Sequence, residues 1–334
     1  MVSLKEIAKK VGVAPSTVSF VLNGKDKEMR ISGDLARRIK AVAKKEGYRP
    51  NQVAISLRTG KSKIIGLVVD MISGSFFASL ARIIEKEMEH HGYKVIYCST
   101  GNDLQKGEDL IHMLYQHQVD GFLIIPTEGM EKDINMLMNK KKPLVLMDSY
   151  FPGTKAPYVL VNNYDGVSKG VSHFIKKGYS KIGFVCNDLK LIQMQDRKKA
   201  YIDTVKSVVG KTSKNLLLTA PFNDSKEDTV QQIRSFLQTK KPQAVMFAAN
   251  YLGVCGLEAI KSLGLKIPDD VAVICFDDHE LFTLYTPEIT VIRQPVEEIA
   301  QTAVAILIDQ MGSEKKIKEK QLLLKGKMIE RMSV

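Results

Sequence analysis

The sequence has few of the features that would place it in a membrane, outside the cell or among disulfide-bonded proteins. It contains no run of about eighteen apolar residues, so no segment is expected to span a bilayer. The four cysteines (Cys98, Cys186, Cys255 and Cys275) form no CxxC pair, and each lies in an apolar stretch where burial as a free thiol is expected. The first residues lack the apolar core of a signal peptide. We therefore expect a reduced, cytoplasmic protein.

Motifs of the common enzyme classes are also missing. No HExxH, GxSxG, phosphate-binding loop or GxGxxG follows a predicted strand. The six histidines lack metal-ligand spacing, because the helical pair His112 and His117 is five residues apart and off the register that aligns two ligands on one zinc. We therefore expect no catalytic residue, no metal and no cofactor, and we predict that the protein is not an enzyme.

Positive charge is concentrated at one end of the chain. Residues 1–63 contain 15 Lys and Arg against 5 Asp and Glu, a net charge of +10, whereas the whole chain carries +12. The other 271 residues therefore contribute only +2. Such a concentration is typical of a module that binds the phosphates of nucleic acid.

The basic segment begins with the pattern of two short amphipathic helices. Apolar residues recur at helical spacing, Gly12 supplies a tight turn, and Pro15 fits the opening turn of the second helix. The buried faces are expected to hold Ile7, Ala8, Val11, Val18, Val21 and Leu22, and the outward face of the second helix Ser16, Thr17, Ser19 and Phe20. This pattern predicts a helix-turn-helix whose second helix enters the DNA major groove.

The remaining sequence divides into further parts. A third helix is expected from Ser32 or Asp34 to about Glu46, and residues 48–62 form a hinge that holds a short helix only when bound to DNA. From residue 64, eight apolar runs of strand length alternate with amphipathic helical stretches. We predict a small all-α DNA-binding domain (1–47), the hinge (48–62), and an α/β core of two doubly wound parallel-sheet lobes (63–334) with a ligand cleft between them.

Together these residues resemble the lactose- and purine-repressor family of bacterial helix-turn-helix transcription regulators. The resemblance covers the whole chain, and its strongest parts are Leu4–Gly24, Gly47–Asn51, Gly66–Val68, Val119–Gly121, Leu146–Asp148, Lys181–Phe184, Ile267–Val271 and Phe276–Asp278. It implies a homodimer on a pseudo-palindromic operator in double-stranded DNA. It also implies a periplasmic-binding-protein-like core that binds a small effector, which we expect to be a carbohydrate or its derivative.

The resemblance assigns the DNA-binding residues. They are Ser3, Pro15, Ser16, Thr17, Ser19, Phe20, Asn23, Arg30, Asn51, Ala54, Leu57 and Arg58. Leu57 matches the leucine with which the family wedges open the minor groove at the operator centre. An apolar wedge unstacks a base step, and the resulting bend brings more basic surface onto the phosphates.

The resemblance also assigns an effector cleft. Its candidate residues are Phe76, Phe77, Thr127, Asp148, Asn162, Gln193, Arg197, Phe222, Asn250 and Asp277. Carboxylates and amides bind hydroxyl groups, arginine donates a fork of hydrogen bonds, and aromatic rings cover apolar ring faces. Asn162 and Tyr251 stand where the family commonly has aspartate, and Leu191 stands where purine-responsive members have arginine. These departures weaken the case for a purine ligand, and they do not identify the particular sugar.

Two other functions stay open at this stage. The same DNA-binding regulator is compatible with control by a protein co-regulator instead of a small molecule. A small-molecule-binding protein without gene regulation would share the core, but it would not need the basic helix-turn-helix segment.

Phe20 generates a prediction about the operator. The family usually carries arginine after the Thr-Val-Ser of the second helix, where it reaches a guanine, whereas phenylalanine can only contact a thymine methyl group. Selection of operator sequences from a random pool is expected to return a half-site without the usual guanine at this position. Recovery of the guanine preference would contradict the prediction.

Overall fold

The computed structural model describes residues 2–72, 74–209, 216–312 and 320–334. The chain divides into two compact units, Met1–Ser62 and Lys63–Val334. Within the described ranges, no helix is both long enough and apolar enough to cross a membrane. All four cysteines are free and buried, as their apolar surroundings predicted.

The first unit contains four helices: α1 (Leu4–Val11), α2 (Pro15–Leu22), α3 (Gly33–Lys45) and α4 (Gln52–Thr59). Gly12 ends α1 in the left-handed region at φ 79°, and Pro15 is the first residue of α2, so both predictions for the turn are confirmed. The apolar faces of α1, α2 and α3 meet in one small core around Ile7, Val18 and Ile39. A helix-turn-helix backed by a third helix results.

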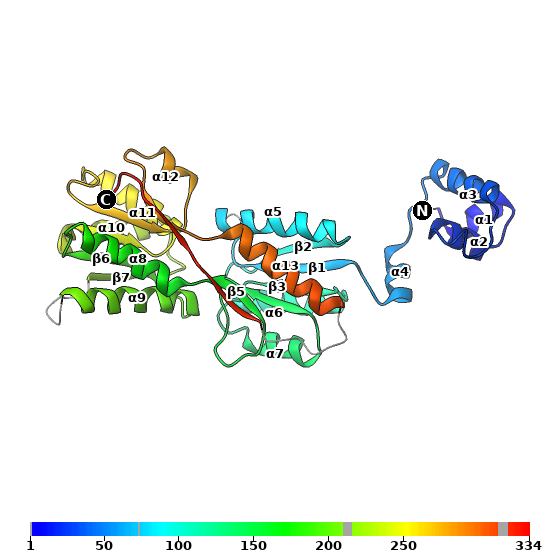
Figure 1. The fold of residues 1–334 in the computed structure, drawn as a ribbon, viewed down its shortest axis with the longest axis horizontal. Helices are drawn as coiled ribbons and strands as arrows, with labels where there is room; N and C mark the ends of the chain where they lie inside the picture. Colours follow the sequence, from blue (N-terminus) through cyan, green and yellow to red (C-terminus); the bar gives the residue numbers. More distant parts are fainter. Residues whose placement is uncertain (1, 73, 210–215, 313–319) are drawn as a thin grey trace. The chain divides into compact units, whose positions relative to one another are not determined.

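The second unit contains two six-stranded sheets, which define its two lobes (Figure 1). The first lobe has the strand order β11-β5-β4-β3-β1-β2, all parallel, and the second has β12-β10-β9-β8-β6-β7, parallel except for β12. The strands are β1 (Ile64–Val69), β2 (Lys94–Ser99), β3 (Gly121–Ile124), β4 (Leu144–Met147), β5 (Tyr158–Val161), β6 (Ile182–Asn187), β7 (Leu216–Ala220), β8 (Ala244–Phe247), β9 (Ala272–Phe276), β10 (Thr290–Arg293), β11 (Gln321–Leu324) and β12 (Lys327–Ile329).

Helices cover both faces of each sheet. In the first lobe α5 and α13 pack on one face and α6 and α7 on the other; in the second, α8 and α9 pair, and α10 pairs with α11. The helices are α5 (Ser75–His90), α6 (Leu104–Gln116), α7 (Glu131–Asn139), α8 (Asn163–Lys176), α9 (Ile192–Val209), α10 (Lys226–Lys240), α11 (Asn250–Ser262), α12 (Glu280–Leu284) and α13 (Val296–Gly312). Strands buried on both faces explain why the sequence shows continuous apolar runs.

The chain passes between the lobes three times (Figure 1). The crossings lie between β5 and α8, between β10 and α13, and between β11 and β12. They run close together, because the Asn162 amide donates to the Leu324 carbonyl at 2.7 Å, and a Cβ on Gly326 would lie 3.5 Å from the Arg293 carbonyl. Any change in the angle between the lobes is therefore taken up by these three short segments.

The predicted α/β architecture with two doubly wound lobes is confirmed, and all eight predicted strands are present. Four strands were not predicted: β7, β10, β11 and β12. Each of the last three begins or ends with a long polar residue (Arg293, Gln321 and Lys327), so none shows the continuous apolar run that marked the predicted strands. Pairing with neighbours distant in the sequence makes these segments strands.

Candidate functional site

A cavity of about 500 Å³ lies between the two lobes. Five of its polar lining residues stand at the carboxyl ends of strands: Asp70 after β1, Asp148 after β4, Asn187 ending β6, Asp277 after β9 and Gln294 after β10. Parallel strands present their carboxyl ends at one edge of a sheet, so each lobe delivers its polar groups to the same cleft. Asp148 and Asp277 have φ angles of 60° and 70°, a left-handed conformation that aspartate tolerates better than most residues.

Arg197, on α9, is the buried cation of the site. Its Nε donates to Asn163 Oδ1 at 2.8 Å and its Nη1 donates to the Ala248 carbonyl at 2.6 Å. Nη1 also lies 3.6 Å from Asp277 Oδ2, and the guanidinium carbon stands 3.7 Å above the centre of the Phe276 ring. A buried charge is tolerated only when it is paired and hydrogen-bonded, and these contacts supply both conditions.

The carboxyl groups of the cleft are partly dehydrated. Burial raises the pKa of Asp70 to about 6, and burial raises the pKa of Asp148 to about 6 with a further contribution from Asp277 and Asp70, against the opposing effect of Arg197. Burial also raises the pKa of Asp277, although Arg197 and a 2.7 Å hydrogen bond from Gln294 Nε2 oppose the increase. With pKa values of about 6, Asp70 and Asp148 are mostly ionised at neutral pH, at a cost to the fold.

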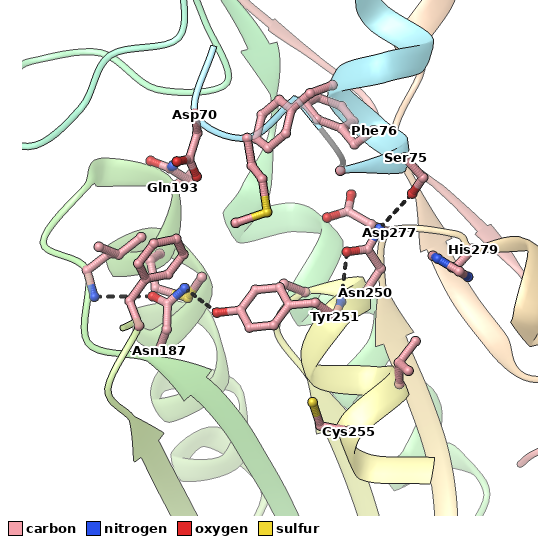
Figure 2. Close-up of a pocket in the computed structure, with 18 of the residues that line it drawn as sticks. Asp70, Ser75, Phe76, Asn187, Gln193, Asn250, Tyr251, Cys255, Asp277 and His279 are labelled. Atoms are coloured by element: carbon pink, nitrogen blue, oxygen red, sulfur yellow. Dashed lines mark hydrogen bonds between the residues drawn. The ribbon is translucent and has the colours of Figure 1, made fainter. Parts of the chain in front are cut away.

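Direct contacts join the lobes across the cleft. Asn250 Nδ2 donates to Ser75 Oγ at 3.2 Å, as Figure 2 shows, and Gln193 Nε2 lies 3.4 Å from Asp148 Oδ2. Outside the cavity lining, the Lys190 amide donates to Glu128 Oε2 at 3.3 Å. The lobes therefore meet through a few polar contacts, and Leu191, which precedes α9, adds apolar packing against the core of the first lobe.

Aromatic rings line the cavity from both lobes. Phe76 and Phe77 pack edge to face with ring centres 5.2 Å apart, and Phe222 and Tyr251 do the same at 6.4 Å. The Tyr251 hydroxyl accepts a hydrogen bond from Asn187 Nδ2 at 2.9 Å (Figure 2). The cleft thus offers apolar ring surfaces beside clustered polar groups, the combination expected of a small-molecule site.

The structure places eight of the ten predicted effector residues in the cavity lining: Phe76, Phe77, Asp148, Gln193, Arg197, Phe222, Asn250 and Asp277. Thr127 lies outside it, where its buried hydroxyl bonds to that of Thr100 at 2.8 Å. Asn162 also lies outside it and caps α8 by accepting from the Asp165 amide at 3.0 Å. In this conformation both residues hold the scaffold, and neither faces the cavity.

Sequence reasoning missed several lining residues. Asp70, Asn187 and Gln294 each stand at the carboxyl end of a strand, so the rule that ligands bind at these ends would have found the first two. Gln294 follows a strand that was itself not predicted. Other missed residues, including Ser75, Tyr251, Cys255 and His279, lie on helices or loops whose inward face only the fold defines.

The predicted DNA-binding residues lie on the first unit. Ser16 is exposed on α2, beside the half-buried Thr17, Ser19 and Phe20, whereas Pro15 and Asn23 stand at the two ends of the helix. Ser3 caps α1 through Glu6, Arg30 is exposed at a φ of 53°, and Asn51 accepts from the Ala54 amide at 3.4 Å. On α4, Ala54, Leu57 and Arg58 are exposed, and the Leu57 side chain is 74% accessible.

Comparison with known proteins finds the same two parts. Residues 3–51 match the family "Bacterial regulatory proteins, lacI family", and residues 171–334 match a periplasmic binding protein-like domain. A ribose operon repressor of Haemophilus influenzae (strain ATCC 51907 / DSM 11121 / KW20 / Rd) is 29% identical over 93% of this chain and 92% of its own length. The transcriptional repressor PurR of Haemophilus influenzae (strain PittEE) is 26% identical over 93% of this chain and 91% of its own.

Solved structures show the same fold. The lac repressor dimer bound to operator and the anti-inducer ONPF superposes with a TM-score of 0.85 at 21% identity, covering 99% of this chain and 98% of that one. A complex of the transcriptional regulator CelR with cellobiose superposes with a TM-score of 0.74 at 22% identity, covering both chains completely.

The buried carboxyl of Asp148 generates a stability prediction. Its raised pKa means that the folded protein holds a proton up to about pH 6, whereas an unfolded aspartate loses it near pH 4, so this group's contribution to stability falls as the pH rises through that range. Asp148→Asn removes the charge and retains a residue that tolerates the left-handed backbone. At about pH 7.5 the full-chain variant is expected to be about 1–3 kcal/mol more stable than the wild type, a gain that shrinks toward about pH 4.5.

The measurement is thermal unfolding of both proteins at the two pH values, where each kcal/mol corresponds to a Tm change of about 2–4 °C. Asp109→Asn, an exposed carboxylate on α6, serves as the matched control and is expected to change neither Tm. An Asp148→Asn protein that is less stable at the higher pH, or equally stabilised at both, would contradict the prediction.

Proposed function

We propose that this chain represses transcription from a specific operator under the control of a small effector bound between the core lobes. The reason is that it belongs to the lacI family of bacterial regulatory proteins. The single observation that carries the effector part is the cavity, which receives aromatic and polar side chains from both lobes. A cavity shared in this way makes ligand binding depend on the angle between the lobes.

DNA binding is assigned to the first unit. In our proposal residues 1–47 read the operator, residues 48–62 form the hinge, and residues 63–334 bind effector and dimerise. Ser16, Thr17 and Phe20 on α2 approach base edges in the major groove, and two copies of the chain read the two half-sites. The concentration of 15 Lys and Arg in residues 1–63 supports the assignment, because phosphate contacts supply most of the affinity.

Leu57 supports the hinge assignment. A leucine side chain that is 74% exposed on a two-turn helix gains nothing from its own fold. An unstacked base step in the minor groove would bury it, and we propose that paired Leu57 side chains of the dimer insert there.

Effector binding and DNA binding are coupled, in our proposal, through the crossings between the lobes. Gln294 lies in the second crossing, lines the cavity and donates to Asp277, so a ligand that contacts it acts directly on a segment that must bend when the lobes close. The resulting change in the first lobe, which carries the hinge at Lys63, either permits or forbids the pairing of the α4 helices on DNA.

A carbohydrate or its derivative is the proposed class of effector. Aromatic rings suit the apolar faces of a sugar, and the amide and carboxylate oxygens suit its hydroxyl groups. The relatives named for ribose and cellobiose are compatible with this class. A protein co-regulator would not need so developed a cavity, so the small molecule is favoured. Cytoplasmic localisation follows from the proposed operator binding.

Reciprocal coupling is the test of the effector mechanism. A ligand that changes operator affinity must itself bind with an affinity changed by the same factor when operator is present, because both follow from one coupling free energy of about 1–3 kcal/mol. Operator Kd is measured with and without ligand, and ligand Kd with and without operator. The expected factors are equal and between about 5 and 150. A ligand that binds the cavity without changing operator affinity would contradict the proposal.

The hinge proposal is tested by Leu57→Ala. Loss of the apolar wedge is expected to weaken operator binding about tenfold or more, since unstacking a base step would no longer bring extra contacts. The slope of log affinity against log salt is expected to change little, because no charge is removed. Leu323→Ala, at a 53% exposed leucine on β11, is the matched control and leaves operator affinity unaltered. Wild-type affinity in the Leu57→Ala protein would refute the wedge.

A further inference from the structure

The cavity contains more negative than positive charge. Asp70, Asp148, Asp224 and Asp277 line it, against Arg197 and Lys226. Both cations already have acidic neighbours. Arg197 pairs with Asp277, and Lys226 Nζ lies 2.6 Å from Glu258 Oε2 at the exposed rim. The two carboxylates of the first lobe, Asp70 and Asp148, therefore have no ion-pair partner within the described part of the chain.

Unused hydrogen-bond acceptors belong to three residues that line the cavity. Among the described residues, Asp70 Oδ1, Gln193 Oε1 and Gln294 Oε1 are buried without a hydrogen-bond partner. Gln193 and Gln294 are only 8% and 5% exposed, and both line the cavity. A buried acceptor without a donor carries a free-energy penalty. The site therefore requires a ligand that is rich in donors.

The donors of the protein are largely occupied. Gln193 directs its amide nitrogen to Asp148, Gln294 directs its own to Asp277, and Asn187 directs its own to the Tyr251 hydroxyl. Gln193 and Gln294 thus keep their amide oxygens without a donor, as Asp70 keeps its Oδ1, whereas Asn187 Oδ1 accepts from the Leu189 amide at 3.2 Å. A ligand bearing an anion would meet acceptors and carboxylates on several sides. Sugar phosphates and sugar acids are disfavoured on this ground.

The aromatic residues strengthen the preference for a cation. Phe76 and Phe77 in the first lobe, and Phe222 and Tyr251 in the second, border the same cavity. The face of an aromatic ring attracts a cation through its quadrupole, and the attraction grows in a desolvated site. Rings and carboxylates together form the surroundings in which a protonated amine is well bound.

We propose that the effector is a polyhydroxylated ring that carries a protonated primary amine, and that the amine binds between Asp70 and Asp148. This assignment rests on the proposed effector function of the cleft and narrows its ligand class to amino sugars and related amines. The ammonium supplies three donors and a positive charge to the edge of the sheet at which β1 and β4 end in Asp70 and Asp148. The hydroxyl groups of the ring reach Gln193, Gln294 and Asn250.

The experiment compares matched ligands on the full-chain protein near neutral pH. Each series contains a hexose, its 2-amino form, its N-acetylated amine and its 6-phosphate, with glucose, galactose and mannose as parents. Affinity is measured by titration calorimetry and by the rise in Tm. In at least one series the free amine is expected to bind at least tenfold more tightly than the neutral parent, and acetylation removes the gain because it removes the charge.

Substitution of the two carboxylates tests their role. In the double variant Asp70→Asn, Asp148→Asn the ratio of the affinity for the amine to the affinity for the neutral parent is expected to fall at least tenfold, because the charge that favours the amine is removed. Asp109→Asn, exposed on α6 away from the cavity lining, is the matched control and retains the preference for the amine. A far lower Tm in the double variant would point to misfolding, in which case the single variants give the same comparison.

The outcomes separate this inference from the proposed function. A neutral or acetylated sugar that binds as well as its amine and changes operator affinity overturns the amine assignment and leaves the proposed function intact. An amine preference that survives in the double variant overturns the assignment of Asp70 and Asp148 as the residues that bind the amine. Absence of binding across all series overturns the inference and counts against effector control by hexoses, whereas operator binding of the Leu57→Ala protein tests the DNA-binding part separately.

Discussion

The buried guanidinium of Arg197 constrains the organisation of the cleft. A cation with 3% exposure has to be paired and hydrogen-bonded, and its partners come from separate elements: Asn163 at the start of α8, the carbonyl of Ala248 after β8, and Asp277 after β9. Satisfying this one group therefore brings the ends of three elements to a common point. The wall of the cavity in the second lobe is built around it, and Gln294 extends the same network into a crossing between the lobes.

The first lobe contributes negative charge from carboxylates, and these carboxylates lack an ion-pair partner comparable to the one Arg197 has in Asp277. Asp70 and Asp148 share the edge formed by the carboxyl ends of β1 and β4, and burial raises the pKa of each to about 6. The lobes thus differ in charge. The second lobe neutralises Arg197 with Asp277, whereas the first lobe has ionised carboxylates above about pH 6. In our proposal this inequality, rather than the shape of the cavity alone, gives the cleft its selectivity among ligands of similar size.

The fold was largely predictable because the two sequence patterns that indicate it, helical spacing and continuous apolar runs, are local. Helical spacing and the turn at Gly12 defined the helix-turn-helix, and apolar runs buried on both faces defined eight strands of the core. The strands β10, β11 and β12 escaped, since a long polar residue in each interrupts the apolar run, and they become strands only by pairing. Arg197, Asp277 and six other lining residues were reached through the family resemblance, whereas Asp70 stood at a strand end where the general rule would have found it.

The sequence by itself determined the division into a basic helical segment and an α/β core, since charge and hydrophobic period are properties of neighbouring residues, whereas the proposed hinge role of Leu57 came from the family resemblance. Only the tertiary structure decided which polar groups meet. Thr127 and Asn162 follow strands as Asp148 and Asp277 do, yet one bonds to Thr100 and the other caps α8. The direction of a side chain at a strand end, and whether a counter-charge lies across the cleft, depends on elements far away in the chain.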